Sequence, residues 1–245
     1  MLRIPWWIVL ATAVSVPAAC TQPESPAASA VEQTVSRPAA PASRAAEPQR
    51  ATASDAASAI PRIVMLGDSL TAGYGLDKPQ SFPALLQQRL NEAGYRYEVV
   101  NAGVSGDTSA GGLRRLDWSL EGNVRVLVLE LGANDGLRGL PLAVVRENLE
   151  RMISAAKTAG SRVVLMGMRI PPNYGPRYTE EFLHLYEHLA KKESLTFIPF
   201  FLSSIVADRS LIQQDGMHPT ADAQPKLLEA VWPTLKPLLR TNHGS

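Results

Sequence analysis

The sequence predicts an α/β fold in which helices cover both faces of a parallel β-sheet. From Pro61 onward, short strand-like runs alternate with amphipathic, helix-like segments, and this alternation argues for parallel pairing. Several runs, such as VRVLVLEL and RVVLMGM, are almost continuously apolar, which is typical of strands buried on both faces. The chain has 245 residues, of which 45% are hydrophobic, and this suffices for one sizeable core.

The predicted elements follow one another in a regular order. Strands are expected over five runs: Arg62–Leu66, Tyr97–Asn101, Val124–Leu131, Arg162–Met168 and Thr196–Phe200. Amphipathic helices are expected over residues 81–94, 141–160, 179–193 and 221–239. The first two helical segments end at Gly94 and Gly160, because glycine is the preferred residue just past a helix C-terminus.

The first 60 residues are not expected to belong to this fold. Residues 1–19 carry one basic residue, Arg3, followed by an apolar stretch too short for a comfortable membrane span. This is typical of a secretory signal peptide, and an uncleaved N-terminal anchor is the alternative. Residues 20–60 are dominated by Ala, Pro and Ser, which predicts a flexible tether. The folded domain is therefore expected over residues 61–240.

Cys20 is the only cysteine, so no intramolecular disulfide can form. Its position after Ala18 and Ala19 resembles the lipobox of bacterial lipoproteins, although Pro17 stands where that pattern usually has leucine. The resemblance implies a lipidated Cys20 that anchors the protein to a membrane, facing the periplasm. Thr21 rather than aspartate follows the cysteine, which favours the outer membrane. Ordinary signal-peptide cleavage nearby is the alternative.

The charge pattern argues against nucleic acid as a partner. The formal net charge is +1, and lysines and arginines are scattered and roughly matched by acids. A nucleic-acid-binding surface would need a basic stripe, often with interleaved aromatic residues.

Polar, glycine-rich stretches follow every predicted strand. They are Asp68–Ser69, GVSGDTSAGG (103–112), GANDGLRG (132–139), RIPPNYGPRY (169–178) and DGMHP (215–219). In open parallel sheets, ligands bind outside the carboxyl ends of the strands. We therefore expect the functional site at this edge of the sheet.

Ser69 is the candidate nucleophile at this edge. A serine hydroxyl is weak until a base removes its proton, and the usual base is a histidine oriented by a carboxylate. His218 follows Asp215 by three residues, so one ring nitrogen could face the carboxylate and the other Ser69. The alternative is that Asp215-Gly216 forms only a turn, since this is a common turn dipeptide.

The backbone around Ser69 is also informative. Gly67 is expected to permit the tight turn, and Gly73 and Gly75 to give the following segment freedom. We interpret Asp68 as a structural acceptor of backbone hydrogen bonds, not as the acid that orients the base.

An oxyanion would need hydrogen-bond donors at the same edge. Ser69 offers its own backbone N–H, the loop at Gly106 can bring a second N–H close, and Asn134 offers a side-chain amide. Taken singly, each stretch could equally be a turn or a helix cap.

Four blocks in this order resemble those of the SGNH (GDSL) hydrolase family. They are GDSL at Gly67–Leu70, Gly106 in SGDTS, GANDG with Asn134, and DGMHP at 215–219. Longer stretches, including NAGVSGDTSAGGLRRL and ELGANDGLRG, are similar to the bacterial thioesterase I / protease I / lysophospholipase subgroup and related arylesterases. The resemblance covers the whole predicted domain.

The resemblance implies a flavodoxin-like, three-layer α/β/α fold with a five-stranded parallel sheet. It implies Ser69 as nucleophile, His218 as base and Asp215 as the orienting acid. The oxyanion hole would be formed by the N–H groups of Ser69 and Gly106 and by the Asn134 side chain, without cofactor or metal.

The implied activity is hydrolysis of small-molecule or lipid esters and thioesters with small or medium acyl chains, through an acyl-enzyme intermediate. A polysaccharide O-acetyl esterase and a non-catalytic lipid- or glycan-binding lipoprotein are the alternatives.

A second motif, HLYEH at His184–His188, fits the H-x-x-E-H pattern of some zinc proteases. On a helix, however, the two histidines share a polar stripe with Glu181, opposite an apolar side. We interpret this stripe as a solvated helix face and expect no metal.

Overall fold

The computed structural model describes residues 60–240. The predicted signal peptide, Cys20 and all but the last residue of the predicted tether lie outside these residues. Within them, no helix is both long and apolar enough to cross a membrane.

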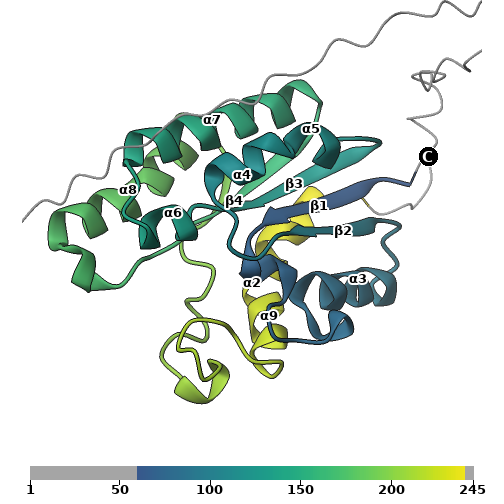
Figure 1. Cartoon of the computed structure of the whole chain (residues 1–245). Helices are drawn as coiled ribbons and strands as arrows, with labels where there is room; N and C mark the ends of the chain where they lie inside the picture. Colours follow the sequence, from purple (N-terminus) through teal and green to yellow (C-terminus); the bar gives the residue numbers. More distant parts are fainter. Residues whose placement is uncertain (1–59, 241–245) are drawn as a thin grey trace, which may run out of the picture. The chain divides into compact units, whose positions relative to one another are not determined.

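A five-stranded parallel sheet forms the centre of the domain, as predicted (Figure 1). Its strands are β1 (Arg62–Gly67), β2 (Glu98–Gly103), β3 (Val124–Glu130), β4 (Arg162–Met166) and β5 (Thr196–Ile198). They pair in the order β2-β1-β3-β4-β5, which is the flavodoxin-like order. Every residue of β3 except Arg125 is buried, as expected of a strand with helices on both sides.

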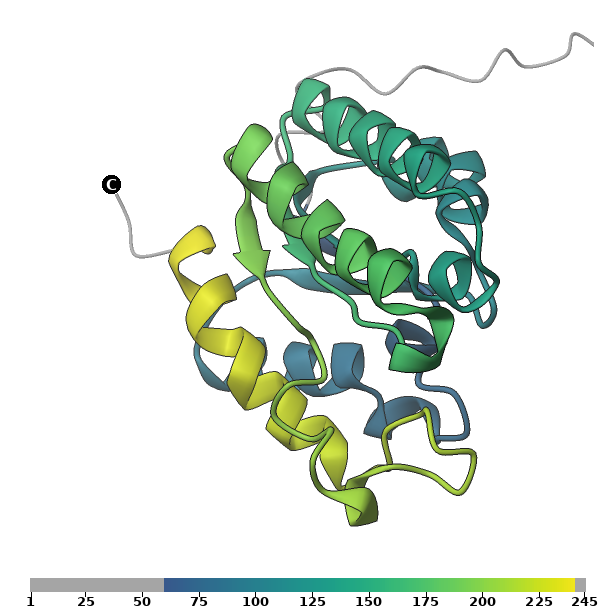
Figure 2. The same cartoon turned by 90° about the vertical axis from the view of Figure 1, so that its left-hand side faces the viewer.

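Helices cover both faces of this sheet, so the predicted three layers are confirmed. On one face lie α3 (Phe82–Glu92) and α9 (Ala223–Leu235), and on the other α7 (Leu142–Thr158) and α8 (Pro176–Lys192) (Figures 1 and 2). The core consists of large apolar side chains without solvent exposure, among them Ile63, Leu66 and Leu127 from the strands and Phe82 and Phe182 from the helices.

Short helices that the sequence did not predict follow the strands. They are α2 (Ser69–Ala72), α4 (Ser109–Arg114), α5 (Leu116–Ser119) and α6 (Ala133–Leu137), together with the 3₁₀ turns η1 (Lys78–Gln80), η2 (Pro172–Tyr174) and η3 (Arg209–Leu211). The 3₁₀ turn η4 (Lys236–Leu238) lies within the helix predicted over residues 221–239. Helices of four to six residues are too short to show a 3.6-residue period, so they read as loops in the sequence.

The fourth and fifth strands end two residues earlier than predicted. Met168 and Ile170, beyond the end of β4, remain buried although they belong to no strand. Burial of the connecting segment, rather than ladder pairing, explains why the apolar run continues past the strand.

The strand order defines where a site can lie. From β1 the chain runs to β2 on one side and then crosses to β3 on the other. The carboxyl ends of β1 and β3 therefore flank a topological switch point, the place where ligands bind in open α/β sheets. Helix α2 begins there, and Gly103 at the end of β2 lets its backbone pack closely, because a Cβ on Gly103 would clash with the backbone of Ala72.

Candidate active site

Ser69 is the first residue of α2, two residues after the end of β1. Asp68 caps this helix: its Oδ1 accepts a hydrogen bond from the N–H of Leu70 at 3.0 Å. Gly73 ends the helix in the left-handed region with φ of 75°, and Gly75 shares that φ, as expected for backbone that glycine alone adopts readily.

The reason for Gly67 differs from the prediction. Its φ is not positive, so the turn does not require glycine for its backbone conformation. A Cβ there would instead clash with the Thr71 hydroxyl and lie 2.5 Å from Oε2 of Glu130. Gly67 therefore makes room for a buried carboxyl group beneath the serine turn.

The structure brings Ser69, His218 and Asp215 into one hydrogen-bonded chain. Nε2 of His218 lies 2.9 Å from Oγ of Ser69, and Nδ1 lies 2.6 Å from Oδ2 of Asp215. With Asp215 ionised, Nδ1 carries the hydrogen and donates it, which leaves Nε2 to accept from the serine hydroxyl. The ring of Tyr74 packs on the imidazole, with ring centroids 4.5 Å apart.

Asp215 is held in its charged form by the same loop. Its Oδ1 accepts the backbone N–H groups of Met217 at 2.9 Å and of His218 at 3.0 Å. These hydrogen bonds lower the pKa of Asp215 from 3.8 to about 2. The backbone N–H of His218 has the largest effect, and the His218 ring and the N–H of Met217 add to it. Both sequence interpretations hold here: Gly216, with φ of 74°, forms a turn, and Asp215 contacts the histidine ring.

The loop carrying the histidine is fastened to the serine side of the site. Gln213 donates two hydrogen bonds across the site: its N–H to the carbonyl of His218 at 2.7 Å, and its Nε2 to the carbonyl of Tyr74 at 2.8 Å. Because Tyr74 lies just after α2, this side chain links the two halves of the site. The sequence offered no signal for Gln213.

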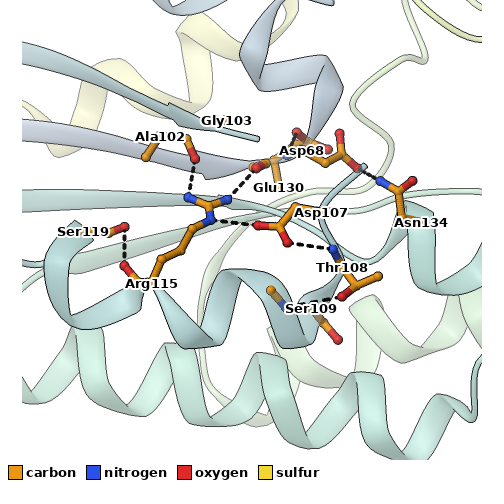
Figure 3. Close-up of polar contacts among 12 residues, drawn as sticks. Asp68, Ala102, Gly103, Asp107, Thr108, Ser109, Arg115, Ser119, Glu130 and Asn134 are labelled. Atoms are coloured by element: carbon orange, nitrogen blue, oxygen red, sulfur yellow. Dashed lines mark hydrogen bonds and ion pairs between the residues drawn. The ribbon is translucent and has the colours of Figure 1, made fainter. Parts of the chain in front are cut away.

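The other two candidate oxyanion donors lie in α6 and in the loop between β2 and α4. Nδ2 of Asn134, in α6, donates to Oδ2 of Asp68 at 3.1 Å (Figure 3). Gly106 has φ of 79°, and its carbonyl accepts from Arg138, the C-cap of α6, at 2.9 Å. Arg138 therefore ties the Gly106 loop to the helix that carries Asn134.

Arg115 joins the ends of two strands to the Gly106 loop, as Figure 3 shows. Its guanidinium donates to the carbonyls of Gly67 at 2.8 Å and Ala102 at 2.5 Å, and its Nε pairs with Asp107 at 2.7 Å. Five N–H donors in one plane suit such a junction. The role of Arg115 could not be predicted from the sequence, because nothing local distinguishes it from its neighbour Arg114.

A second buried junction lies behind the loop. Asp135 accepts from the N–H of Ser109 at 2.8 Å and from its hydroxyl at 2.6 Å, and Asn148 donates to the same hydroxyl at 3.0 Å. All three side chains are buried and come from α4, α6 and α7. The loops around the site are thus held by satisfied polar groups in the interior.

Two buried carboxyl groups lie beneath Ser69. Asp68 is 1% exposed and Glu130, the last residue of β3, is 0% exposed. Burial raises the pKa of Asp68 to about 6 and raises that of Glu130 well above its usual range, where the neighbouring Asp68 charge adds to the effect.

The two histidines of the HLYEH motif lie on the exposed side of α8. Their rings stack on each other with centroids 6.0 Å apart, and His184 pairs with Glu187 at 2.9 Å. Phe182, Leu185 and Leu189 occupy the buried side. Among residues 60–240, no group of three or more histidine, cysteine or acidic side chains is placed to hold a metal ion.

Comparison with known proteins assigns this site to a family. The sequence profile described as the GDSL-like lipase/acylhydrolase family matches residues 65–224, more than half of the chain. The chain belongs to this family of SGNH hydrolases. The match contains Ser69, Gly106, Asn134, Asp215 and His218.

Individual relatives agree with this assignment. Esterase TesA of Pseudomonas aeruginosa is 51% identical over 178 residues, covering 72% of this chain and 89% of the relative. The thioesterase 1/protease 1/lysophospholipase L1 of Escherichia coli is 39% identical over 190 residues, covering 77% of this chain and 89% of the relative. A crystal structure of TesA superposes with a TM-score of 0.70 at 50% identity, covering 73% of this chain and 99% of that structure. This GDSL-family chain therefore shares both sequence and fold with hydrolases of known structure.

Proposed function

We propose that the protein is a serine esterase that hydrolyses carboxylic esters and thioesters of small or medium acyl chains through an acyl-enzyme intermediate. The hydrogen-bonded chain from Asp215 through His218 to Ser69 carries the proposal. It combines a nucleophile, a base and an orienting carboxylate at hydrogen-bond distance, which is the arrangement that acyl transfer requires.

The mechanism follows from the roles of these atoms. Nε2 of His218 takes the proton from Ser69 as Oγ attacks the acyl carbon, and the Asp215 carboxylate stabilises the resulting imidazolium through Nδ1–H. The imidazolium then protonates the departing alcohol or thiol, leaving the acyl group on Ser69. A water molecule, deprotonated by the same nitrogen, hydrolyses the acyl-enzyme and restores the serine.

Three donors would stabilise the negative oxygen of the tetrahedral intermediates. We assign this role to the N–H groups of Ser69 and Gly106 and to the amide of Asn134. The support is their placement: Ser69 begins α2, and the Asn134 amide donates a hydrogen bond to Asp68, the residue before the nucleophile. The hydrogen bond from Arg138 to the Gly106 carbonyl holds the loop that carries the Gly106 N–H.

The substrate class rests on the relatives. One is named an esterase and another a thioesterase, protease and lysophospholipase. We therefore propose acyl esters, acyl thioesters and lysophospholipids as substrates of this chain.

A substrate panel tests this proposal. Wild type and Ser69→Ala are assayed with p-nitrophenyl esters of increasing acyl length, acyl-CoAs, lysophospholipids and acetylated polysaccharides. Turnover of the first three by wild type alone is the expected result. Turnover confined to acetylated polysaccharides would make the protein an O-acetyl esterase, and binding without any turnover would make it a binding module.

The anchoring of the protein is a separate proposal. We propose that Cys20 is lipidated and that the Ala/Pro/Ser-rich segment up to residue 60 tethers the hydrolase domain to a membrane, facing the periplasm. Its support is the sequence alone: the short apolar leader, the small residues before Cys20 and the tether composition. Thr21 after the cysteine favours the outer membrane.

A further inference from the structure

Glu130 is a buried acid that the proposed mechanism does not use. It is the last residue of β3 and pairs in register with Gly67, the last residue of β1. Its side chain has no solvent exposure. It therefore lies under the turn that presents Ser69, where a charged group is costly unless it is paired.

One oxygen of Glu130 fastens both ends of that turn. Oε2 accepts the backbone N–H of Asp68 at 3.2 Å and the hydroxyl of Thr71 at 2.7 Å. These two donors flank Ser69 on either side in the sequence. Gly67 leaves the space in which Glu130 can approach, since any Cβ there would collide with it.

The surroundings of the other oxygen, Oε1, indicate that the Glu130 carboxyl is protonated. Oε1 of Glu130 is buried and receives no hydrogen bond from any donor in the described part of the chain. The titratable groups that face this carboxyl are Asp68, the N-cap of α2, and the buried phenol of Tyr186 on α8. Neither is a cation, so the carboxyl has no ionic partner to offset its burial.

Asp68, in contrast, has a hydrogen-bond donor for each of its oxygens. Burial raises the pKa of Asp68 to about 6, while the N–H of Leu70, the nearby His218 and the amide of Asn134 favour its ionised form. Two adjacent carboxyl groups that cannot both ionise share one proton, as in other acid pairs. Both oxygens of Asp68 accept N–H hydrogen bonds, whereas Oε1 of Glu130 has no donor, so the shared proton belongs on Glu130.

Asp68 connects Glu130 to the candidate oxyanion donor Asn134. Its Oδ2 holds one N–H of the Asn134 amide at 3.1 Å, and this leaves the second N–H of the same nitrogen for the substrate oxygen. Its Oδ1 holds the N–H of Leu70 and so the first turn of α2.

We infer that Glu130, as an uncharged carboxylic acid, is a positioning residue that holds the Ser69 turn through Asp68 and Thr71 and orients Asn134 through Asp68. This inference rests on the proposed esterase function. Glu130 itself touches no reacting atom.

Two substitutions at this position separate a positioning role from a purely structural one. Glu130→Gln keeps an uncharged acceptor for the Thr71 hydroxyl and for the Asp68 N–H, whereas Glu130→Ala removes it. We expect Glu130→Gln to keep kcat and KM within about threefold of wild type. Glu130→Ala should lower kcat by roughly 10-fold or more with little change in KM, because displaced oxyanion donors affect the transition state most.

Ser161→Ala is the matched control. The buried Ser161 hydroxyl donates to the carbonyl of Val124 at the opposite end of β3, at 2.7 Å. This variant should lower the thermal stability and leave kcat unchanged. If Glu130→Ala loses stability as Ser161→Ala does but keeps the kcat of wild type, the inference is overturned.

Infrared spectroscopy tests the charge state without any turnover, and also if Glu130→Ala does not fold. Wild type at neutral pH should show the carbonyl stretch of a buried protonated carboxylic acid, and this band should be missing from Glu130→Gln. A wild type without the band, or Glu130→Gln as impaired as Glu130→Ala, would overturn the inference. Failure of the proposed function itself looks different: wild type would hydrolyse no ester, while the infrared band would still be present.

Discussion

Nε2 of His218 lies 2.9 Å from Oγ of Ser69, although 149 positions separate the two residues in the chain. Ser69 follows strand β1, while His218 lies in the segment between β5 and α9. The contact depends on the folded sheet and on Gln213, which ties the histidine loop to Tyr74. The base therefore reaches the nucleophile only in the native domain.

His218→Ala should abolish ester hydrolysis, because no other group contacts the Ser69 hydroxyl among the described residues. In wild type, kcat/KM should fall on the acid side with the binding of one proton, since a protonated imidazole cannot accept the serine proton. Steady-state kinetics over a pH series measure both effects. His184→Ala, on the exposed face of α8, should behave as wild type and is the control.

Asp215→Asn should keep the fold and greatly reduce kcat. The amide can no longer stabilise the imidazolium and favours the wrong ring tautomer; the corresponding change in a serine protease lowers kcat about 10⁴-fold. Asp208→Asn is the control, since Asp208 also accepts a backbone N–H in this loop region but contacts no histidine. If Asp215→Asn turns over esters at the rate of wild type, Asp215 is only a turn residue.

Asn134→Ala should reduce kcat by roughly 10²–10³-fold with a smaller change in KM, as expected on loss of one oxyanion donor. Asn173→Ala, in the exposed 3₁₀ turn after β4, should leave both parameters unchanged. A change in KM alone would show that Asn134 binds the substrate's ground state instead.

Asp68→Asn should change the pH dependence of stability. Burial raises the pKa of Asp68 from 3.8 to about 6, so its contribution is fully present below the lower value and is lost as the pH rises through the higher one. Asparagine cannot titrate but still caps a helix. The free energy of unfolding of wild type, measured relative to this variant, should therefore fall by on the order of 3 kcal/mol across that interval.

Urea unfolding at a series of pH values measures this difference. Asp208→Asn provides a control of opposite sign, because the Ser210 hydroxyl and N–H lower the pKa of Asp208. Relative to that variant, wild type should lose stability only as the pH falls. A flat or rising difference between wild type and Asp68→Asn would contradict the assigned burial effect.

The proposed lipidation of Cys20 can be tested in cells. Globomycin, which blocks lipoprotein signal peptidase, should cause an unprocessed precursor to accumulate. Cys20→Ser should release soluble enzyme or leave an uncleaved form, because the acyl chains are lost. Membrane-bound mature protein in both experiments would indicate a different anchor.

Much of the fold could be predicted from the sequence, because the signals are local. The runs of β3 and β4 are apolar enough to mark buried strands, and glycines at Gly94 and Gly160 mark where helices end. The parallel order then places the polar stretches at one edge. What could not be predicted is structure without a local period, such as the four-residue helix α2.

The same distinction applies to the site. Ser69, Asp215 and His218 are residue types with known chemistry in recognisable blocks. The role of Glu130 could not be predicted, since it lies within the predicted strand VRVLVLEL and a single acid there gives no indication of its partner. The role of Arg115 could not be predicted either, because two of its acceptors are backbone carbonyls that only the pairing of β1 with β2 brings together.

The central claim is that Ser69 is the nucleophile, and covalent labelling tests it most directly. A fluorophosphonate reacts with an activated serine and leaves one phosphonyl group on its oxygen. Intact-mass and peptide analysis should show one such group on Ser69 of wild type and of the control Ser203→Ala, with loss of ester hydrolysis. Ser69→Ala should carry no label and have no esterase activity. Substantial hydrolysis by Ser69→Ala, or labelling of wild type at a different residue, would contradict the account.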